Sequence, residues 1–267
     1  MPVGAGPARE ATGSNLYRWL RGRFYRWKGP TFGLREALLW STALDTWHRY
    51  AALMEVLEKR LEPETRILEV GPGWFGLEFF LLPAYLEAGH LVQVDVLSRP
   101  LLRLRAEGAK LVGSGATLPV KDDAFDFVVA MDVLEHVPKD ARPAFARELQ
   151  RVARRGGFLH MPLESEDGTY QAASSDEAFQ RWFARRYGRP EPNIEEHLAC
   201  GHPTVGDLRL YFPRVSLRPT QSVEDWLWYM TRERTASRRL FTGLIRYLRG
   251  VRKGPPYYSA LAVWEAG

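Results

Sequence analysis

From residue 66 onward, short apolar runs alternate with longer stretches of helical periodicity. This alternation constrains the fold most, because parallel strands need long crossover connections that return across the sheet. It predicts strands near 66–71, 91–96, 109–113, 125–131 and 157–161, with helices near 75–88, 100–107 and 141–154. The run FDFVVAM is apolar almost throughout, as expected for a strand covered on both faces. We therefore predict an α/β fold with a doubly wound, mostly parallel, seven-stranded sheet that binds its ligand at the carboxyl ends of the strands.

The rest of the chain is divided around this core. Residues 1–63 are predicted to form an N-terminal tail and a helical cap, with one helix over 42–61, and residues 64–267 form the α/β domain. Two insertions are expected in that domain: a polar stretch at 163–203, interpreted as a long loop, and an arginine-rich helical segment at 222–253. A short helix at 205–211 and strands near 215–220 and 256–266 complete the predicted core.

The formal net charge of +5 is unevenly distributed. Residues 1–40 and 231–253 together hold +12, so the other 204 residues sum to −7. This distribution argues against a wholly basic nucleic-acid-binding domain. The segment 14–28, which contains NLYRWLRGRFYRW, has three interpretations: contact with an anionic membrane, stacking on nucleic acid, or an amphipathic lid on the core. Of the two external partners, the membrane is favoured over nucleic acid.

The chain has the composition of a folded protein in a reducing compartment. It is 45% hydrophobic, and Cys200 is its only cysteine, so it has no internal disulfide. The first thirty residues contain no apolar stretch of signal-peptide length, and no window reaches the ~18 apolar residues of a membrane span. We predict a cytoplasmic protein, peripheral at the membrane if residues 14–28 bind lipid.

A glycine turn follows the first predicted strand. Gly71, Gly73 and Gly76 in RILEVGPGWFG match G-x-G-x-x-G, and Asp95 ends the next strand, which fits a dinucleotide-binding unit. A pyrophosphate requires backbone N–H groups and no nearby anion, yet Glu69 precedes the turn and Pro72 removes one N–H. S-adenosylmethionine has no phosphate and carries a sulfonium and an ammonium, so an acidic turn suits it better.

Several ordered motifs extend this reading. EVGPG, the acidic residue after the second strand, GSGATLPVKDDAFDFVV, MDVLEHV and ELQRVARRGGFLHMP together resemble the class I S-adenosylmethionine-dependent methyltransferases, the type 11 branch in particular. The resemblance covers residues 66–162 well and 204–222 loosely. It implies a cofactor site at these positions: Glu69, Gly71 and Gly73 at the methionine end, Asp95 at the ribose, Ser114 and Leu118 near the adenine, and Asp132, Val133 and His136 near the methyl group and the acceptor. Ser114 stands where the family usually has an aspartate.

Other interpretations of the same residues stay open. The chain could be an NAD(P)-binding oxidoreductase with a Rossmann fold, or a catalytically silent scaffold that binds the cofactor. Gly71 and Gly76 would then serve only a tight turn and close helix contact, and Asp95 would only cap the following helix. His136 at the start of a helix has a structural role at least as readily as a catalytic one.

The resemblance implies a methyltransferase whose acceptor is a small molecule or a lipid- or glycan-linked metabolite, methylated on oxygen. The insertions at 163–203 and 222–253 are expected to cover the acceptor. A hydroxyl acceptor needs a base, and the candidates are His136, His197 and His202, followed by His160, Glu164 and Glu196. Glu135 with His136 and His160 could in principle bind a divalent metal, but no ligand run has zinc-type spacing, so no metal site is predicted.

Overall fold

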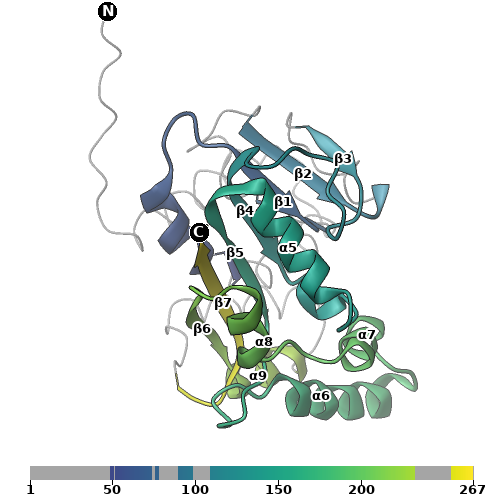
Figure 1. Ribbon diagram of the computed structural model, residues 1–267. Helices are drawn as coiled ribbons and strands as arrows, with labels where there is room; N and C mark the ends of the chain where they lie inside the picture. The colour runs from purple at the N-terminus through teal and green to yellow at the C-terminus, as the bar shows by residue number, and fades with distance from the viewer. Residues whose placement is uncertain are drawn as a thin grey trace, which may run out of the picture.

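The computed structural model describes residues 49–50, 52–73, 76–77, 90–98, 109–231 and 254–266. Within these ranges one seven-stranded sheet has the order β3-β2-β1-β4-β5-β7-β6 (Figure 1). The strands are β1 (Ile67–Val70), β2 (Leu91–Asp95), β3 (Lys110–Val112), β4 (Phe125–Met131), β5 (Ala153–Pro162), β6 (Ser216–Ser222) and β7 (Tyr257–Glu265). The predicted α/β fold is confirmed. The predicted helices near 75–88 and 100–107, and the segment 14–28, lie outside the described residues.

Strands β1 to β5 are parallel, whereas β7 runs antiparallel between β5 and β6. The strand order reverses beside β1, where Ile67 pairs with Leu91 of β2 on one side and with Phe127 of β4 on the other. Open α/β sheets bind their ligands beside such a reversal, at the carboxyl ends of the strands. The candidate site is therefore expected at the carboxyl ends of β1, β2 and β4.

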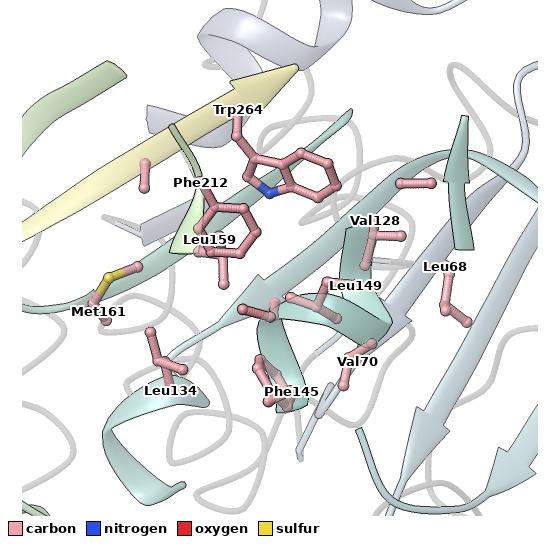
Figure 2. Packing of buried hydrophobic residues seen from close by; sticks show 14 of the residues in the cluster. Leu68, Val70, Val128, Leu134, Phe145, Leu149, Leu159, Met161, Phe212 and Trp264 are labelled. Carbon is pink, nitrogen blue, oxygen red and sulfur yellow. The ribbon is translucent and has the colours of Figure 1, made fainter. Parts of the chain in front are cut away.

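Each face of the sheet is covered by its own hydrophobic cluster. Helix α5 (Arg142–Val152) covers one face, and Figure 2 shows Phe145 and Leu149 directed toward Val70 and Val128. Residues 52–57 are helical and continue into the 3-10 helix η1 (Glu58–Arg60). This N-terminal segment covers the opposite face. It contributes Tyr50, Leu53, Val56, Leu57 and Leu61 to a cluster with Ile67, Phe127, Phe158 and Leu261.

One hydrophobic cluster thus combines side chains from before residue 63 with side chains of the sheet, which follow it. The division of the chain at that residue remains a prediction.

The boundary between α5 and β5 differs from the prediction. The helix was expected to continue to residue 154, and the strand to begin at 157, but β5 begins at Ala153 directly after the helix. Ala153 pairs with Phe125 of β4, and its N–H bonds back to the carbonyl of Gln150. Gly156, with φ of 132°, then lies in a backbone region that a helix does not use.

The insertion at 163–203 is helical rather than a long loop. It contains α6 (Ala172–Tyr187) and α7 (Pro192–Cys200). Helix α6 ends at Gly188 in the left-handed region, and α7 begins with Glu191, which accepts a hydrogen bond from the Ile194 N–H, followed by Pro192. Both helices pack with α9 (Val223–Thr231) and β7 through a cluster of Phe179, Phe183, Ile194, Trp226 and Tyr258. This apolar cluster is what stabilises the two helices.

Helix α8 (Val205–Tyr211) confirms the predicted short helix, and a capping box of Thr204 and Asp207 starts it. None of the helices in the described ranges is both long enough and apolar enough to cross a bilayer.

Candidate active site

The glycine turn after β1 has the shape that its sequence predicts. Gly71 and Gly73 have φ of 67° and 57°, a region that side chains disfavour. A Cβ on Gly71 would lie 2.6 Å from Cγ2 of Val133, so the turn passes closely against the segment after β4. No described atom outside its chain neighbours lies within 4 Å of a Cβ placed on Gly73. The turn is therefore closed against Val133 on one side and open at Gly73.

Glu69 lies beneath this turn and is fully buried. Its carboxylate accepts hydrogen bonds from the Leu77 N–H at 2.8 and 2.9 Å, from the Tyr50 hydroxyl at 2.8 Å and from Nε2 of Gln93 at 2.8 Å. These bonds connect the turn to the N-terminal helix and to β2. Glu69 therefore sets the shape of the turn, and its predicted contact with the methionine end of a cofactor remains a prediction.

Asp95 ends β2 beside the open part of the turn. One carboxylate oxygen accepts from the Gly73 N–H at 3.4 Å, and the other accepts from the Leu97 N–H at 2.9 Å. The carboxylate is half-buried. This position lets Asp95 hold the backbone of the turn and face a ligand above Gly73.

The two residues expected near an adenine differ in burial. Ser114 is exposed after β3, where its Oγ accepts from the Ala116 N–H at 3.1 Å. Leu118 is buried in the α5 cluster, and its N–H donates to Oε2 of Glu148 at 2.8 Å. The contact of Ser114 and Leu118 with an adenine remains a prediction.

Asp132, directly after β4, organises a second group of polar side chains. It has a positive φ of 54°, and its carboxylate contacts Arg49 and Nδ1 of His160. Burial alone would raise the pKa of Asp132, but Arg49 and His160 outweigh it and hold that pKa well below the usual value. His160 Nε2 lies 2.9 Å from the Thr220 hydroxyl. Both nitrogens of His160 are thus engaged, which makes it a positioning residue for Asp132.

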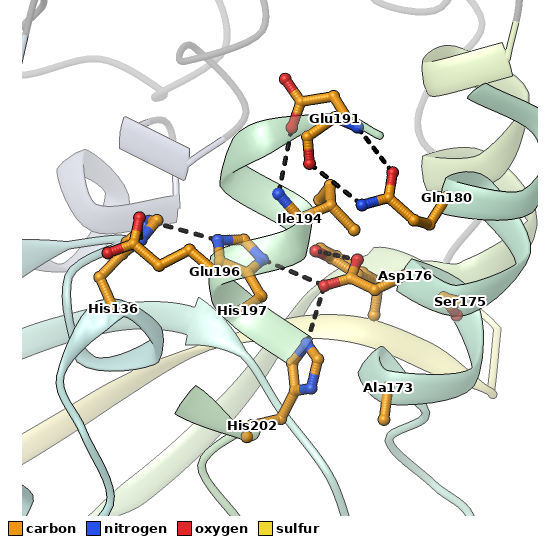
Figure 3. Close-up of polar contacts among 12 residues, drawn as sticks. His136, Ala173, Ser175, Asp176, Gln180, Glu191, Ile194, Glu196, His197 and His202 are labelled. Carbon is orange, nitrogen blue, oxygen red and sulfur yellow. Dashed lines mark hydrogen bonds and ion pairs between the residues drawn. The ribbon is translucent and has the colours of Figure 1, made fainter. Parts of the chain in front are cut away.

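A chain of imidazoles and carboxylates joins the short 3-10 helix η3 (Leu134–His136) to α7 and α6 (Figure 3). His136 Nδ1 lies 3.0 Å from Oε2 of Glu196, and its Nε2 lies 3.2 Å from Nε2 of His197. His197 Nδ1 lies 3.0 Å from Oδ2 of Asp176. The structure thus brings two of the three predicted catalytic histidines together.

The third, His202, contacts Asp176 through Nε2 at 2.8 Å and has a side chain only 2% exposed. It lies behind the carboxylate, away from His136, so its place here is a positioning one. The other oxygen of Asp176 accepts from the Tyr258 hydroxyl at 2.8 Å. Burial would raise the pKa of Asp176, but the hydrogen bonds from His197 and His202 reverse this and lower it.

Asp176 and Arg142 were not among the predicted site residues. The sequence does carry a signal for Asp176, because it shares a helix face with Phe179 and Phe183, where a carboxylate must be buried. Arg142 is fully buried at the start of α5 and donates to the carbonyls of Val137, Cys200 and Gly201. It fixes the end of α7 against η3. Nothing in its local sequence indicates the contacts with Cys200 and Gly201, which are distant in the chain.

Comparisons with known proteins bear on this geometry. Residues 68–161 match the protein family described as "Methyltransferase domain". A Mycobacteroides abscessus protein described as an uncharacterized methyltransferase is 27% identical over 163 residues, 52% of this chain and 56% of that protein. The chain thus spans little more than half the length of that relative.

Among solved structures, a cyclopropane synthase from Mycobacterium tuberculosis superposes with a TM-score of 0.52 at 15% identity, over 82% of this chain and 84% of that one. The PH0226 protein of Pyrococcus horikoshii gives 0.50 at 14% identity, over 92% and 99%. At these identities the two structures show that the fold is shared.

Proposed function

We propose that the protein transfers a methyl group from S-adenosylmethionine to an acceptor. The premise is that residues 68–161 of this chain form a class I S-adenosylmethionine-dependent methyltransferase domain. One observation carries the proposal. The turn at Gly71 and Gly73, the Asp95 carboxylate, and the Asp132–Val133 segment meet at the carboxyl ends of β1, β2 and β4. This is the place where the fold binds ligands.

The side chains at this place fit a cationic cofactor without phosphate. No described atom outside the chain neighbours lies within 4 Å of a Cβ on Gly73, and Asp95 beside it has a carboxylate that can accept hydrogen bonds from both ribose hydroxyls. Glu69 is buried beneath the turn and Pro72 lacks an N–H, which disfavours a pyrophosphate. When bound, S-adenosylmethionine supplies an electrophilic methyl group on a sulfonium. The chain would then act mainly by orientation, which contributes up to about 7–11 kcal/mol in well-oriented reactions.

We extend the proposal to an oxygen acceptor on a small molecule or on a lipid- or glycan-linked metabolite. A hydroxyl must lose its proton as the new bond forms, and the part-exposed His136 lies after β4 on the acceptor side. Its link through His197 to the buried Asp176 supports a role in holding that proton.

Residues 14–28 lie outside the described residues, and their contact with an anionic membrane stays a proposal, which flotation with anionic vesicles would test.

Calorimetric titration with S-adenosylhomocysteine, S-adenosylmethionine and NAD tests the cofactor. We expect the first two to bind, and Asp95→Ala to weaken both by about 10- to 100-fold, the value of a hydrogen bond to a charged group. Asp122→Ala, which removes an exposed carboxylate paired with Arg151, should leave the affinity unchanged. Binding of NAD in place of the other two would support an oxidoreductase. Binding without methyl transfer to a broad panel of hydroxyl acceptors would support a silent scaffold.

A further inference from the structure

Glu135, in η3, is buried without a hydrogen-bond partner among the residues that the structure describes. Its exposed fraction is 0%, and neither carboxylate oxygen bonds to another described residue. A buried carboxylate in this state is costly, because the water that it lost has not been replaced.

Two imidazole rings lie close to this carboxylate, and the nitrogen atoms through which they face each other also lack a suitable hydrogen-bond partner in the described part of the chain. The Nε2 atoms of His136 and His197 face each other at 3.2 Å, while each Nδ1 lies 3.0 Å from a carboxylate oxygen. In a neutral imidazole, an Nδ1–H that donates to a carboxylate leaves Nε2 as an acceptor. The two Nε2 lone pairs would then oppose each other with no proton between them. A cation between them would turn this repulsion into two bonds.

We propose that Glu135, His136 and His197 bind a divalent first-row transition-metal ion such as Zn²⁺. One ligand atom from each of the three residues lies within 4.8 Å of the other two. Two nitrogens 3.2 Å apart can both lie at the Zn–N distance of about 2.0–2.1 Å. Two imidazoles and one carboxylate form a ligand set that zinc and related ions use with a further position open.

The surroundings of the two histidines support the proposal independently. Metal-binding histidines usually donate their second N–H to a carboxylate, which fixes the tautomer and the ring direction. Glu196 occupies this position for His136, and Asp176 occupies it for His197, as Figure 3 shows. Asp176 itself fits less well as a ligand, because His197, His202 and Tyr258 already donate to it. The sequence offers His160 as the third possible metal ligand beside Glu135 and His136. In the structure His160 bonds Asp132 and Thr220, and His197 takes its place in the set.

The open coordination position would let the ion take part in methyl transfer, a role that rests on the proposed function. Glu135 follows β4 by a few residues, beside the Asp132–Val133 segment where the acceptor is expected. A hydroxyl of the acceptor bound to the ion would have a lower pKa and would lose its proton more readily. His136 would then act as a metal ligand, and the proton would leave to solvent or to a neighbouring carboxylate.

Titration of the chelator-treated full-length protein with Co²⁺ and Zn²⁺ tests the site without requiring activity. We expect one equivalent of Co²⁺ to give visible d–d absorption that Zn²⁺ abolishes. Glu135→Gln should weaken binding of both ions about 100-fold or more, since it removes a direct ligand and even indirect partners contribute about 10- to 100-fold. His90→Ala and Glu265→Gln are matched controls at the other end of the strands, and both should bind as the unmodified protein does.

Absence of the absorption, or equal metal binding by Glu135→Gln, would overturn the proposal. Glutamine has nearly the shape of a protonated glutamate, so the variant should fold, and circular dichroism checks this. Titration of the same variant with S-adenosylhomocysteine separates the two proposals. For this variant we expect retained nucleoside binding with lost metal binding. Metal binding without nucleoside binding by the unmodified protein would contradict only the proposed function.

Discussion

Buried carboxylates hold the imidazoles of the candidate site in fixed directions. Asp132 engages Nδ1 of His160, and Asp176 engages both His197 and His202. Because one ring nitrogen of each histidine is fixed by these bonds, the direction of the other nitrogen is set by the fold. The chemistry at His136 and His197 therefore depends on residues that no ligand need touch.

At the same scale, Gly71→Ala tests the close approach of the turn to Val133. The new Cβ would lie 2.6 Å from Val133 Cγ2 at a φ of 67°. We expect the turn to move and S-adenosylhomocysteine binding to fall by at least about 10-fold, in addition to a cost of about 1–3 kcal/mol in stability from strain and overlap. Gly188→Ala is the control, because it has a φ of 70° and open space. For this control, urea unfolding should show the loss of stability caused by strain, and calorimetry should show unchanged S-adenosylhomocysteine binding. An equal loss of binding in both variants would contradict the steric role of Val133.

At the scale of elements, the predicted strands were located well and the insertion was not. Strands β1, β2 and β4 are buried at all or nearly all positions and are mostly apolar, as burial on both faces requires. Helices α6 and α7 carry many charged residues, and their stability comes from a small aromatic cluster with α9 and β7. Local periodicity is weak where the partners of a helix are distant in the chain.

The junction of β5 with β7 depends on Gly156. A Cβ at this position would lie 2.2 Å from the backbone oxygen of Trp264, which cannot move without breaking the strand pair. We expect Gly156→Ala to lower the free energy of unfolding by about 1–3 kcal/mol, the usual cost of overpacking. Urea unfolding measures this. Gly254→Ala, where no described atom lies within 4 Å, should have little effect, and a similar loss there would contradict the explanation.

For the whole molecule, acid is expected to destabilise the fold. The pKa values of Asp126, Asp132, Asp176 and Glu148 are all lowered by their partners, which include Arg154, Arg49, His197 and Arg151 respectively. A carboxyl with a lowered folded-state pKa contributes stability that is fully present above its unfolded-state pKa and lost as the pH falls through the folded value. The loss should begin near pH ~4, the ordinary range for these side chains.

Urea unfolding between pH 7 and pH 3 checks this expectation. Glu135 acts in the opposite direction, because its raised pKa makes burial of the charged form costly at neutral pH. The four carboxyl groups with a lowered pKa outnumber Glu135, so we expect the free energy of unfolding to decline as the pH falls. Stability that stays constant or rises below pH 4 would contradict this balance.

The sequence by itself determined the alternating fold, the glycine turn and the position of Asp95, because these depend on local patterns of burial and backbone freedom. Only the tertiary structure decided that Glu69 is a buried support, that His202 lies behind Asp176, and that His197 rather than His160 meets Glu135 and His136. The two histidine relations join residues tens of positions apart through helices α6 and α7. Side-chain directions across such distances follow from how the elements pack together, which no local pattern of residues specifies.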